Sequence, residues 1–530
     1  MDGGLSTRRG SVAGPSSPGP DPFARSVQSI AKGTTIGLVG TLSFYLFTFV
    51  SRVVIARTYT QTHWGEFNVG VSLVGLLSTI SLLGFQQALA RELSFESDPE
   101  ERSAIVGGTI LVAVALGAIT SATMYFDAGF FASLFHDPGL VPVFEILALS
   151  VGFNIVAAVL ASIHQGFQNV LPNAVFVLIA NPALFVGVLL ISLFANSGFN
   201  GLVLAYTASW MITTVALGLY TIVRLPRHLP GFSWPRRLPR SRFWHLAVSL
   251  WGVNSLAYVT SYFDTLYLAA HYSAATVGLY SAAMTLARVF LLANGVTTFI
   301  FLPVVAGLHR DGQFETIRRV FVALNRWVVT VTLPLFFLFA LDPSLSIRAV
   351  FGRPFVDASL PLVILSVGVF LSVAVGPVNA TMAGLGAGRT LLITTGISAA
   401  LNLVLSVALI PTYGAVGAAA AWSVARAAYP LTGAIVLYRE HAITVWRSTF
   451  YRPLAVALAV GVPIFAAVNL VFLPFWAVVP LYFLGAVLFL GAVLGTRAAD
   501  PGDLLLVSGI ERVLGRPIPW LRRLFVSAQA

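Results

Sequence analysis

Four charged residues lie inside long apolar stretches of the chain: Arg52, Asp264, Arg288 and Arg426. A charged side chain in a membrane-spanning helix costs roughly 2.5–3.5 kcal/mol on insertion scales, so each one needs a physical reason. Each arginine either snorkels to the nearest interface, forms a structural ion pair or serves a site. Arginine binds phosphate and pyrophosphate through paired hydrogen bonds, and three arginines against one aspartate leave a shared cavity positive. We therefore predict these four as substrate-binding residues of a cationic cavity.

Polar side chains accompany these charges at helical spacing. Stripes of this kind either hold helices together or line a water-filled cavity, and we favour the cavity. One stripe surrounds Asp264, a second runs from Asn68 to Gln86, and a third leads from Ser281 through Arg288 to Gly295. The predicted cavity-lining residues are Asn68, Ser72, Thr79, Asn254, Ser261, Tyr267, Ser281 and Thr285.

The composition places these residues in a membrane protein. Of 530 residues, 57% are apolar and only 10% are charged, whereas a soluble domain carries about 25% charged residues. The mean hydropathy of +0.87 points the same way. Cysteine is absent, which excludes disulfides, thiolate metal sites and cysteine nucleophiles.

Apolar stretches of about 20 residues, the length that crosses a bilayer as a helix, recur along the chain. We predict an all-α polytopic membrane protein with about 14 transmembrane helices. The predicted spans are 33–56, 67–90, 104–126, 141–163, 172–195, 201–223, 246–270, 278–303, 327–341, 360–383, 390–410, 415–438, 453–473 and 475–496.

The distribution of arginine predicts the orientation, because positive charge is retained on the cytoplasmic side. With the N-terminal tail inside, 25 of the 31 basic residues fall in inside segments, whereas outside segments hold only Arg57, Arg348 and Arg353. This predicts a multi-pass protein of the cell (plasma) membrane with both termini in the cytoplasm. It also accounts for the net charge of +11 without a nucleic-acid partner.

Six parts follow from this division of the chain. They are a disordered cytoplasmic tail (1–32), an N-terminal six-helix lobe (33–223), a basic cytoplasmic linker lying on lipid headgroups (224–245), a C-terminal six-helix lobe (246–438), an extra helix pair (453–496) and a cytoplasmic amphipathic tail (497–530). The linker divides the first twelve spans six and six, so an internal duplication is expected.

Two matches support that duplication. The stretch around Gly65 aligns with the stretch around Gly278 at an offset of 213 residues, and Gly198–Gly201 aligns with Gly414–Gly417 at an offset of 216. Because each half has an even number of spans, the two copies are predicted to be parallel and related by an axis along the membrane normal.

Local residues in the first two spans resemble a known family. They are Arg52-Val-Val-Ile-Ala-Arg57, Trp64-Gly65-Glu66-Phe67, Leu83-Gly84-Phe85 and Ala88-Leu89-Ala90-Arg91. Together with two six-helix lobes and a terminal helix pair, they resemble the polysaccharide-export and lipid-linked oligosaccharide flippases of the multidrug/oligosaccharidyl-lipid/polysaccharide superfamily. The chain departs from that family's opening pattern at Thr58-Tyr59-Thr60, where a Leu-Gly pair is expected.

The resemblance implies a transporter and not an enzyme. Its substrate would be a saccharide on a polyprenyl (di)phosphate, moved from the cytoplasmic to the outer leaflet by two lobes rocking around the cationic cavity. It implies that spans one, two, seven and eight face the lobe interface, where Arg52 and Asp264 would pair to close an outer gate. We expect a monomer that needs no cofactor, with a coupling cation as a possible further partner.

Two alternatives remain. Asp264 is the kind of buried carboxylate that a cation-coupled multidrug and toxin extrusion exporter uses. A membrane glycosyltransferase or ligase is disfavoured because convergent acidic residues are missing from the loops, and His136-Asp137-Pro138 is predicted to be a turn and not a metal site.

Overall fold

The computed structural model describes residues 22–229 and 239–444, with short stretches between 455 and 489. Every regular element of this part of the chain is helical, which confirms the all-α prediction. The elements of the first half are α1 (Pro22–Thr58), α2 (Gln61–Ser81), α3 (Phe85–Phe95), α4 (Pro99–Phe126), α5 (Ala128–Leu134), α6 (Leu140–Gly166), the π-helical η1 (Asn173–Ala180), α7 (Asn181–Phe194) and α8 (Gly198–His228). Those of the second half are α9 (Ser241–His271), α10 (Ala274–Ala287), α11 (Phe290–Arg310), α12 (Phe314–Leu341), α13 (Pro343–Val350), the 3₁₀-helical η2 (Arg353–Ala358), α14 (Ser359–Ala374), α15 (Val378–Gly384) and α16 (Gly388–His441).

The described residues contain nine helices long and apolar enough to cross a membrane, or ten when the bent pair α2 and α3 counts as one span. The chain is therefore a multi-pass membrane protein. Each predicted span from 33–56 to 415–438 falls on one helix or on two consecutive helices. The last two predicted spans lie largely outside the described residues, so the number fourteen stays a prediction.

Two helices begin earlier than the apolar pattern predicted. Helix α1 begins at Pro22, so residues 22–32 are helical although they were assigned to the disordered tail. Helix α12 begins at Phe314 and not near residue 327, and it buries Arg326, which the arginine count had placed in an inside loop. Hydropathy missed the start of α12 because a helix that packs on a neighbour can be polar on its other face.

Helix α16 contains the spans predicted at 390–410 and 415–438, joined at Gly414. Gly414 has φ 55° and ψ −129°, which breaks the helical path. The Ser398 hydroxyl donates to the Ala425 carbonyl oxygen at 2.7 Å, although 27 residues of straight helix would separate the two by about 40 Å. The two arms therefore fold back on each other as a hairpin.

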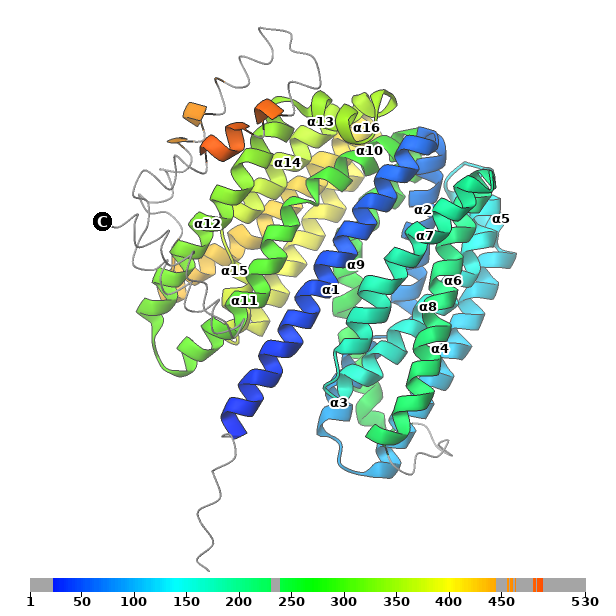
Figure 1. The fold of residues 1–530 in the computed structure, drawn as a ribbon, viewed down its shortest axis with the longest axis vertical. Helices are drawn as coiled ribbons and strands as arrows, with labels where there is room; N and C mark the ends of the chain where they lie inside the picture. Colours follow the sequence, from blue (N-terminus) through cyan, green and yellow to red (C-terminus); the bar gives the residue numbers. More distant parts are fainter. Residues whose placement is uncertain are drawn as a thin grey trace, which may run out of the picture.

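The helices form two groups with α1 running diagonally between them (Figure 1). In the first, α6 packs between α4 and α8, and α7 packs on α8; in the second, α14 packs between α12 and α16. The groups meet where α2 packs on α10 and α9, and where α3 packs on α9. Following the predicted orientation, we call the end at the α1–α2 connection the outer end and the end where α9 begins the inner end.

Helices α2 and α10 cross at two glycines. A Cβ on Gly65 would lie 1.7 Å from the Ala274 carbonyl oxygen, and one on Gly278 would lie 2.3 Å from that of Gln61. These are the glycines that the sequence repeat aligned with each other. The contact is therefore reciprocal, as expected for equivalent helices that meet at an axis between two parallel repeats.

Substituting Gly65 tests this crossing. We expect Gly65→Val to force α2 away from α10, since the new side chain would overlap backbone that cannot move aside. The chain has no native cysteine, so spin labels on Thr62→Cys and Asp357→Cys, both exposed at the outer end, report the spacing by double electron–electron resonance. The distance distribution should move to longer values. Gly187→Val is the matched control because nothing lies within 4 Å of its Cβ position; equal distributions in both variants would contradict the crossing.

Candidate functional site

Arg288 occupies the short break between α10 and α11. Its Nη2 donates to the Ser261 carbonyl oxygen of α9 at 3.3 Å. Its guanidinium carbon lies 5.5 Å from the centre of the Tyr262 ring, within the range of a cation–π interaction. A half-buried cation is thus held by a carbonyl dipole and an aromatic face, neither of which neutralises its charge.

Arg52 reaches the same region from α1. Its Nη1 donates to the Thr285 hydroxyl oxygen at 2.8 Å, and that hydroxyl donates to the Ser281 carbonyl oxygen at 2.7 Å. The charges of Arg52 and Arg288 repel each other. Arg52 therefore contacts α10, and this contact brings two like charges together.

Asp264 is the acidic member of the group and is fully buried on α9. The Tyr280 hydroxyl donates to its Oδ2, whereas Oδ1 has no hydrogen-bond partner among the described residues. Asp264 interacts electrostatically with Arg288. Arg52 and Asp264 form no ion pair within the described part of the chain, so the predicted outer-gate pair is not formed in this conformation: Tyr280 and Thr285 are the partners instead.

Arg426 completes the group from the second arm of α16. Its Nε is buried and makes no hydrogen bond to any described residue. Its charge interacts with Arg288, with Tyr429 of its own helix and with Tyr45 of α1. Arg288 therefore interacts electrostatically with Arg52, Asp264 and Arg426, and we call these four residues the arginine cluster. A buried guanidinium N–H without an acceptor is suited to an anion that arrives from outside.

The predicted lining residues fall into two sets. Thr285 and Ser261 bond to the arginine cluster, and Ser281 accepts a hydrogen bond from Thr285. Thr79 and Ser261 line a cavity of about 270 Å³ at the join of α2 and α3, together with Gln86, Gln87 and Tyr258.

The remaining predicted residues lie elsewhere. The Asn68 side chain donates to the Trp64 carbonyl oxygen of its own helix at 2.7 Å, and Tyr267 stacks on Phe263 and His271. Ser72 is buried and presents its carbonyl oxygen to Tyr258. The side chain of Asn254 lies outside the described residues.

Aromatic residues on α9 were missed by the sequence analysis. Trp251 donates to the Ile80 carbonyl oxygen at 3.0 Å and Tyr258 to the Ser72 carbonyl oxygen at 2.5 Å, so both bond to α2. Tyr258 also stacks on Tyr262 at 4.6 Å between ring centres. Spacings of seven and four residues place the three rings on one helix face, and this pattern was the signal available in the sequence.

The outer end of the interface is closed by contacts with backbone. Arg57, at the end of α1, donates to the carbonyl oxygens of Val350, Ala349 and Arg348 at the end of α13. A cation at a helix C-terminus is favourable because the helix dipole is negative there. Gln61 donates to the Pro354 carbonyl oxygen. These bonds reinforce the α2–α10 crossing.

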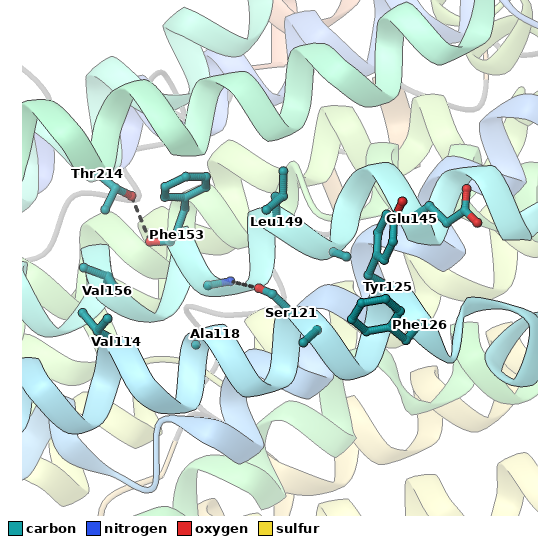
Figure 2. Close-up of a pocket in the computed structure, with 14 residues that line it drawn as sticks. Val114, Ala118, Ser121, Tyr125, Phe126, Glu145, Leu149, Phe153, Val156 and Thr214 are labelled. Carbon is teal, nitrogen blue, oxygen red and sulfur yellow. Dashed lines mark hydrogen bonds between the residues drawn. The ribbon is translucent and has the colours of Figure 1, made fainter.

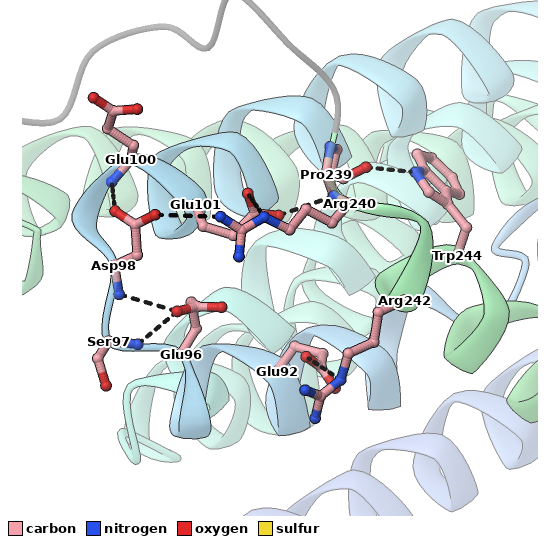
Figure 3. Close-up of polar contacts among 10 residues, drawn as sticks. All are labelled: Glu92, Glu96, Ser97, Asp98, Glu100, Glu101, Pro239, Arg240, Arg242 and Trp244. Carbon is pink, nitrogen blue, oxygen red and sulfur yellow. Dashed lines mark hydrogen bonds and ion pairs between the residues drawn. The ribbon is translucent and has the colours of Figure 1, made fainter.

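The inner end is closed by ion pairs between α3–α4 and the start of α9 (Figure 3). Arg240 Nε lies 3.3 Å from Glu101 Oε2, and its Nη2 lies 3.7 Å from Asp98 Oδ2. Arg242 Nε lies 3.7 Å from Glu92 Oε2. We call these five residues the inner ionic cluster. Two arginines of the predicted linker therefore bind carboxylates of the first helix group.

Two further features support the inner contact. Phe85 packs against Phe243 and Trp244 at 6.2 and 5.6 Å between ring centres. Gly84 approaches α9 so closely that a Cβ would lie 2.1 Å from the Ala247 carbonyl oxygen. Beside this contact, the backbone N–H groups of Asp98 and Ser97 bond to Glu96 and hold its pKa below the usual range. In this conformation both ends of the interface are closed.

Another cavity, of about 650 Å³, lies apart from the arginine cluster (Figure 2). It follows α4, α6 and α8, where Gly117 and Gly152 let two helices approach closely. The Gly152 N–H donates to the Ser121 hydroxyl at 3.0 Å, and Glu145 is its only charged lining residue among those described. This groove has no cation for a phosphate.

Metal chemistry finds no support in the described residues, where no three His, Asp or Glu side chains are grouped to hold an ion. His136 has φ 53°, and Asp137 Oδ1 accepts the Gly139 N–H at 2.9 Å. This segment is the turn that the sequence predicted.

A family model described as "Polysaccharide biosynthesis protein" matches residues 30–307, more than half of the chain. The chain belongs to the polysaccharide biosynthesis protein family. This confirms the family that the motifs of the first two spans indicated. The match contains Arg52, Asp264 and Arg288, and it extends from α1 to α11. No curated protein matches the chain.

Solved structures share the fold of this family member. A structure titled "Lipid II flippase MurJ, inward closed conformation" has a TM-score of 0.67 at 13% identity and covers 85% of this chain and 97% of that one. An inward-facing multidrug resistance MATE family transporter of the MOP superfamily has a TM-score of 0.55 at 14% identity and covers 79% of this chain and 94% of that one. A MOP superfamily transporter from Pyrococcus furiosus has a TM-score of 0.52 at 14% identity and covers 79% of this chain and 95% of that one. At these identities the likeness shows the fold.

The balance of charge in the arginine cluster is testable by stability. Arg288→Gln leaves the buried Asp264 without its cation, and we expect a loss of about 1–3 kcal/mol, the usual cost of an uncompensated buried polar group. Asp264→Asn in the same protein should recover most of that loss, because the amide oxygen still accepts from Tyr280. Thermal unfolding in detergent measures both. Exposed Arg310→Gln is the control, and equal losses in the single and double variants would contradict the coupling.

The inner ionic cluster predicts a salt-sensitive closure. Arg240→Glu places a third carboxylate beside Asp98 and Glu101, so the start of α9 should move away from α4. Spin labels on Phe95→Cys and His245→Cys should report longer distances, and high salt should lengthen them in the unsubstituted protein through screening. Arg389→Glu reverses an exposed charge on another helix and should leave the distances unchanged. Insensitivity to both Arg240→Glu and salt would show that aromatic packing alone closes this end.

Proposed function

We propose that the protein is a membrane flippase that moves a saccharide linked to a polyprenyl (di)phosphate from the cytoplasmic to the outer leaflet of the cell membrane. The observation that carries this proposal is the arginine cluster at the junction of α1, α9, α10 and α16, where Arg288 interacts electrostatically with Arg52, Arg426 and Asp264. The membership of the polysaccharide biosynthesis family supports the same substrate class. We also propose that both termini of the chain lie in the cytoplasm.

The chemistry of the cluster favours an anion. Among the described residues, the buried Nε–H of Arg426 has no acceptor, and Arg288 contacts a carbonyl oxygen and a ring and interacts with the charge of Asp264. Phosphate oxygens supply strong charge-assisted hydrogen bonds to such groups. The anion would also relieve the repulsion between Arg52 and Arg288. Hydrogen bonding and charge neutralisation therefore both favour a phosphate-containing ligand.

The two closures supply a route for alternating access. Opening the inner end separates α3 and α4 from α9 and breaks the inner ionic cluster, while the α2–α10 crossing keeps the outer end shut. Opening the outer end separates Gly65 from Ala274 and Arg57 from α13. The cluster lies between these closures, so the headgroup reaches one side at a time while the lipid tail stays in the bilayer.

A cation-coupled exporter is the second candidate, favoured by one observation. Asp264 is fully buried and its Oδ1 has no partner among the described residues, so it is placed to take up a proton or a cation. In the proposed flippase the same carboxylate would serve a coupling cation, with the protein acting as a monomer. We propose a transporter and not an enzyme, without a cofactor.

The experiment uses the purified full chain in liposomes. The probe is a fluorescent short-chain polyprenyl diphosphate that carries one N-acetylhexosamine, and a membrane-impermeant quencher reports which leaflet holds it. The protein should accelerate translocation, and Arg288→Gln and Arg426→Gln should each slow it by about 10-fold or more, because a hydrogen bond to a charged group contributes about 1.5–3 kcal/mol.

Exposed Arg310→Gln should translocate the lipid at the original rate. The proposal fails if the protein does not exceed empty liposomes. Efflux of a cationic drug that is driven by a proton or sodium gradient and abolished by Asp264→Asn would support the exporter instead.

A further inference from the structure

A polar cavity of about 320 Å³ lies within the first helix group, beside the arginine cluster but separate from it. Its volume is at the lower end of the ~300–1,000 Å³ that is typical of ligand pockets. Polar and aromatic side chains from α3, α6, η1 and α8 line it. They are Gln86, Asn154, Ser162, Gln165, Asn173 and Trp210. Of this set, the sequence pattern had included only Gln86 in a polar stripe.

The amides of this cavity are available to a ligand. The side chains of Gln86, Asn154, Gln165 and Asn173 make no hydrogen bond within the described part of the chain. Ser162 in contrast is already used, since its hydroxyl donates to the Ala158 carbonyl oxygen at 2.8 Å. Each free amide offers two N–H donors and one carbonyl acceptor.

The spacing on α6 explains how the space arises. Asn154, Ala158, Ala161 and Gln165 are separated by four, three and four residues, so they share one helix face. The two alanines between the amides leave room that a larger side chain would fill. The result is an open floor with an amide at each end.

The opposite walls are irregular helices. Asn173 opens η1, and π-helical segments are rare and often occur at functional sites. Gln86 lies just after the join of α2 and α3, where the chain passes through positive φ at Leu83 and Gly84 and bends by 41°. Discontinuous membrane helices commonly form substrate sites in transporters.

The cavity adjoins the proposed path of the headgroup. Gln86 and Gln87 line both this cavity and the 270 Å³ cavity at the α2–α3 join. That second cavity is also lined by Ser261, whose carbonyl oxygen accepts from Arg288. Polar residues therefore link Arg288 to the amides.

The lining restricts the class of ligand. No charged side chain lines the cavity among the described residues, so neither an anion nor a cation would find a counter-charge there. Sugar hydroxyls donate and accept hydrogen bonds, as the amides do, and an indole ring supplies a flat apolar face. An uncharged sugar fits both requirements.

We propose that this amide cavity binds the first, uncharged sugar unit of the substrate, a hexose or N-acetylhexosamine, while the arginine cluster holds the diphosphate. This inference rests on the proposed function and names part of its substrate. It separates two tasks: the arginines bind any polyprenyl diphosphate, and the amides select the lipid that carries a neutral sugar.

Binding to the purified full chain tests the proposal with four probes. They are a short-chain polyprenyl diphosphate alone and the same lipid carrying a hexose, an N-acetylhexosamine or a hexuronic acid. At least one neutral sugar should lower the dissociation constant about 10-fold relative to the bare lipid, because a site built to hydrogen-bond a group discriminates against its absence. The hexuronic acid should give no gain.

Two substitutions locate the effect. Asn154→Leu and Gln165→Leu should each remove the 10-fold preference and leave the affinity for the bare lipid unchanged, which also shows that the variant is folded. Asn200→Leu makes the same change at an exposed position at the outer end of α8 and should keep the preference.

The outcomes separate the two proposals. If the unsubstituted protein binds all four probes equally, and Arg288→Gln weakens all of them, the flippase proposal stands and the amide cavity holds only water. A preference that survives both leucine substitutions also overturns the assignment. If the protein binds none of the probes, the proposed function and this inference fail together.

Discussion

Charge kept inside an apolar helix bundle is the constraint on which the rest of this structure depends. Arg52, Arg288 and Arg426 cannot face hydrocarbon at low cost, and Asp264 alone does not neutralise them. They are kept from lipid only where α1, α9, α10 and α16 meet, so the two helix groups must come together around them. Tyr280, Thr285 and the Ser261 carbonyl oxygen hold the charges in place without cancelling them. The excess positive charge is therefore a built feature of the interface.

The two closures of that interface differ in chemistry. At the outer end, Gly65 and Gly278 bring the backbones of the equivalent helices α2 and α10 together, and Arg57 caps the end of α13. At the inner end, the exposed Arg240 and Arg242 pair with the half-buried Asp98 and with the buried carboxylates of Glu101 and Glu92. Separating the inner end therefore depends on charge, whereas separating the outer end exposes tightly packed helix surface. The internal symmetry determines which helices cross at the outer end, and local residues determine what holds each end closed.

Much of the fold followed from periodicity, because apolar length and repeated glycines are properties of the chain alone. The first twelve spans, the match of Gly65 to Gly278 and the selection of four charged residues all rest on such properties of the sequence. Partners were harder to predict, because they depend on which helix faces meet. Asp264 takes Tyr280 and not Arg52, Arg326 is buried within a longer α12, and the rings of α9 bond to α2. The amide cavity was missed because its residues are spread over α3, α6, η1 and α8, and no single stretch of sequence contains the pattern.

The separation of charged and neutral polar groups has a consequence for transport. A headgroup held by arginines alone would bind tightly and without regard to the sugar, since charge-assisted hydrogen bonds are the stronger kind. Neutral amide hydrogen bonds contribute only about 0.5–1.5 kcal/mol each after water is displaced. In the proposed mechanism a few of them would distinguish a glycosylated lipid from a bare one, yet they are weak enough to release it. Because α3 packs on α6 within the first helix group as well as on α9, separating α3 from α9 leaves the four walls of the amide cavity together, and a sugar bound there would move with the first helix group while the arginine cluster, which draws on α9, α10 and α16, does not.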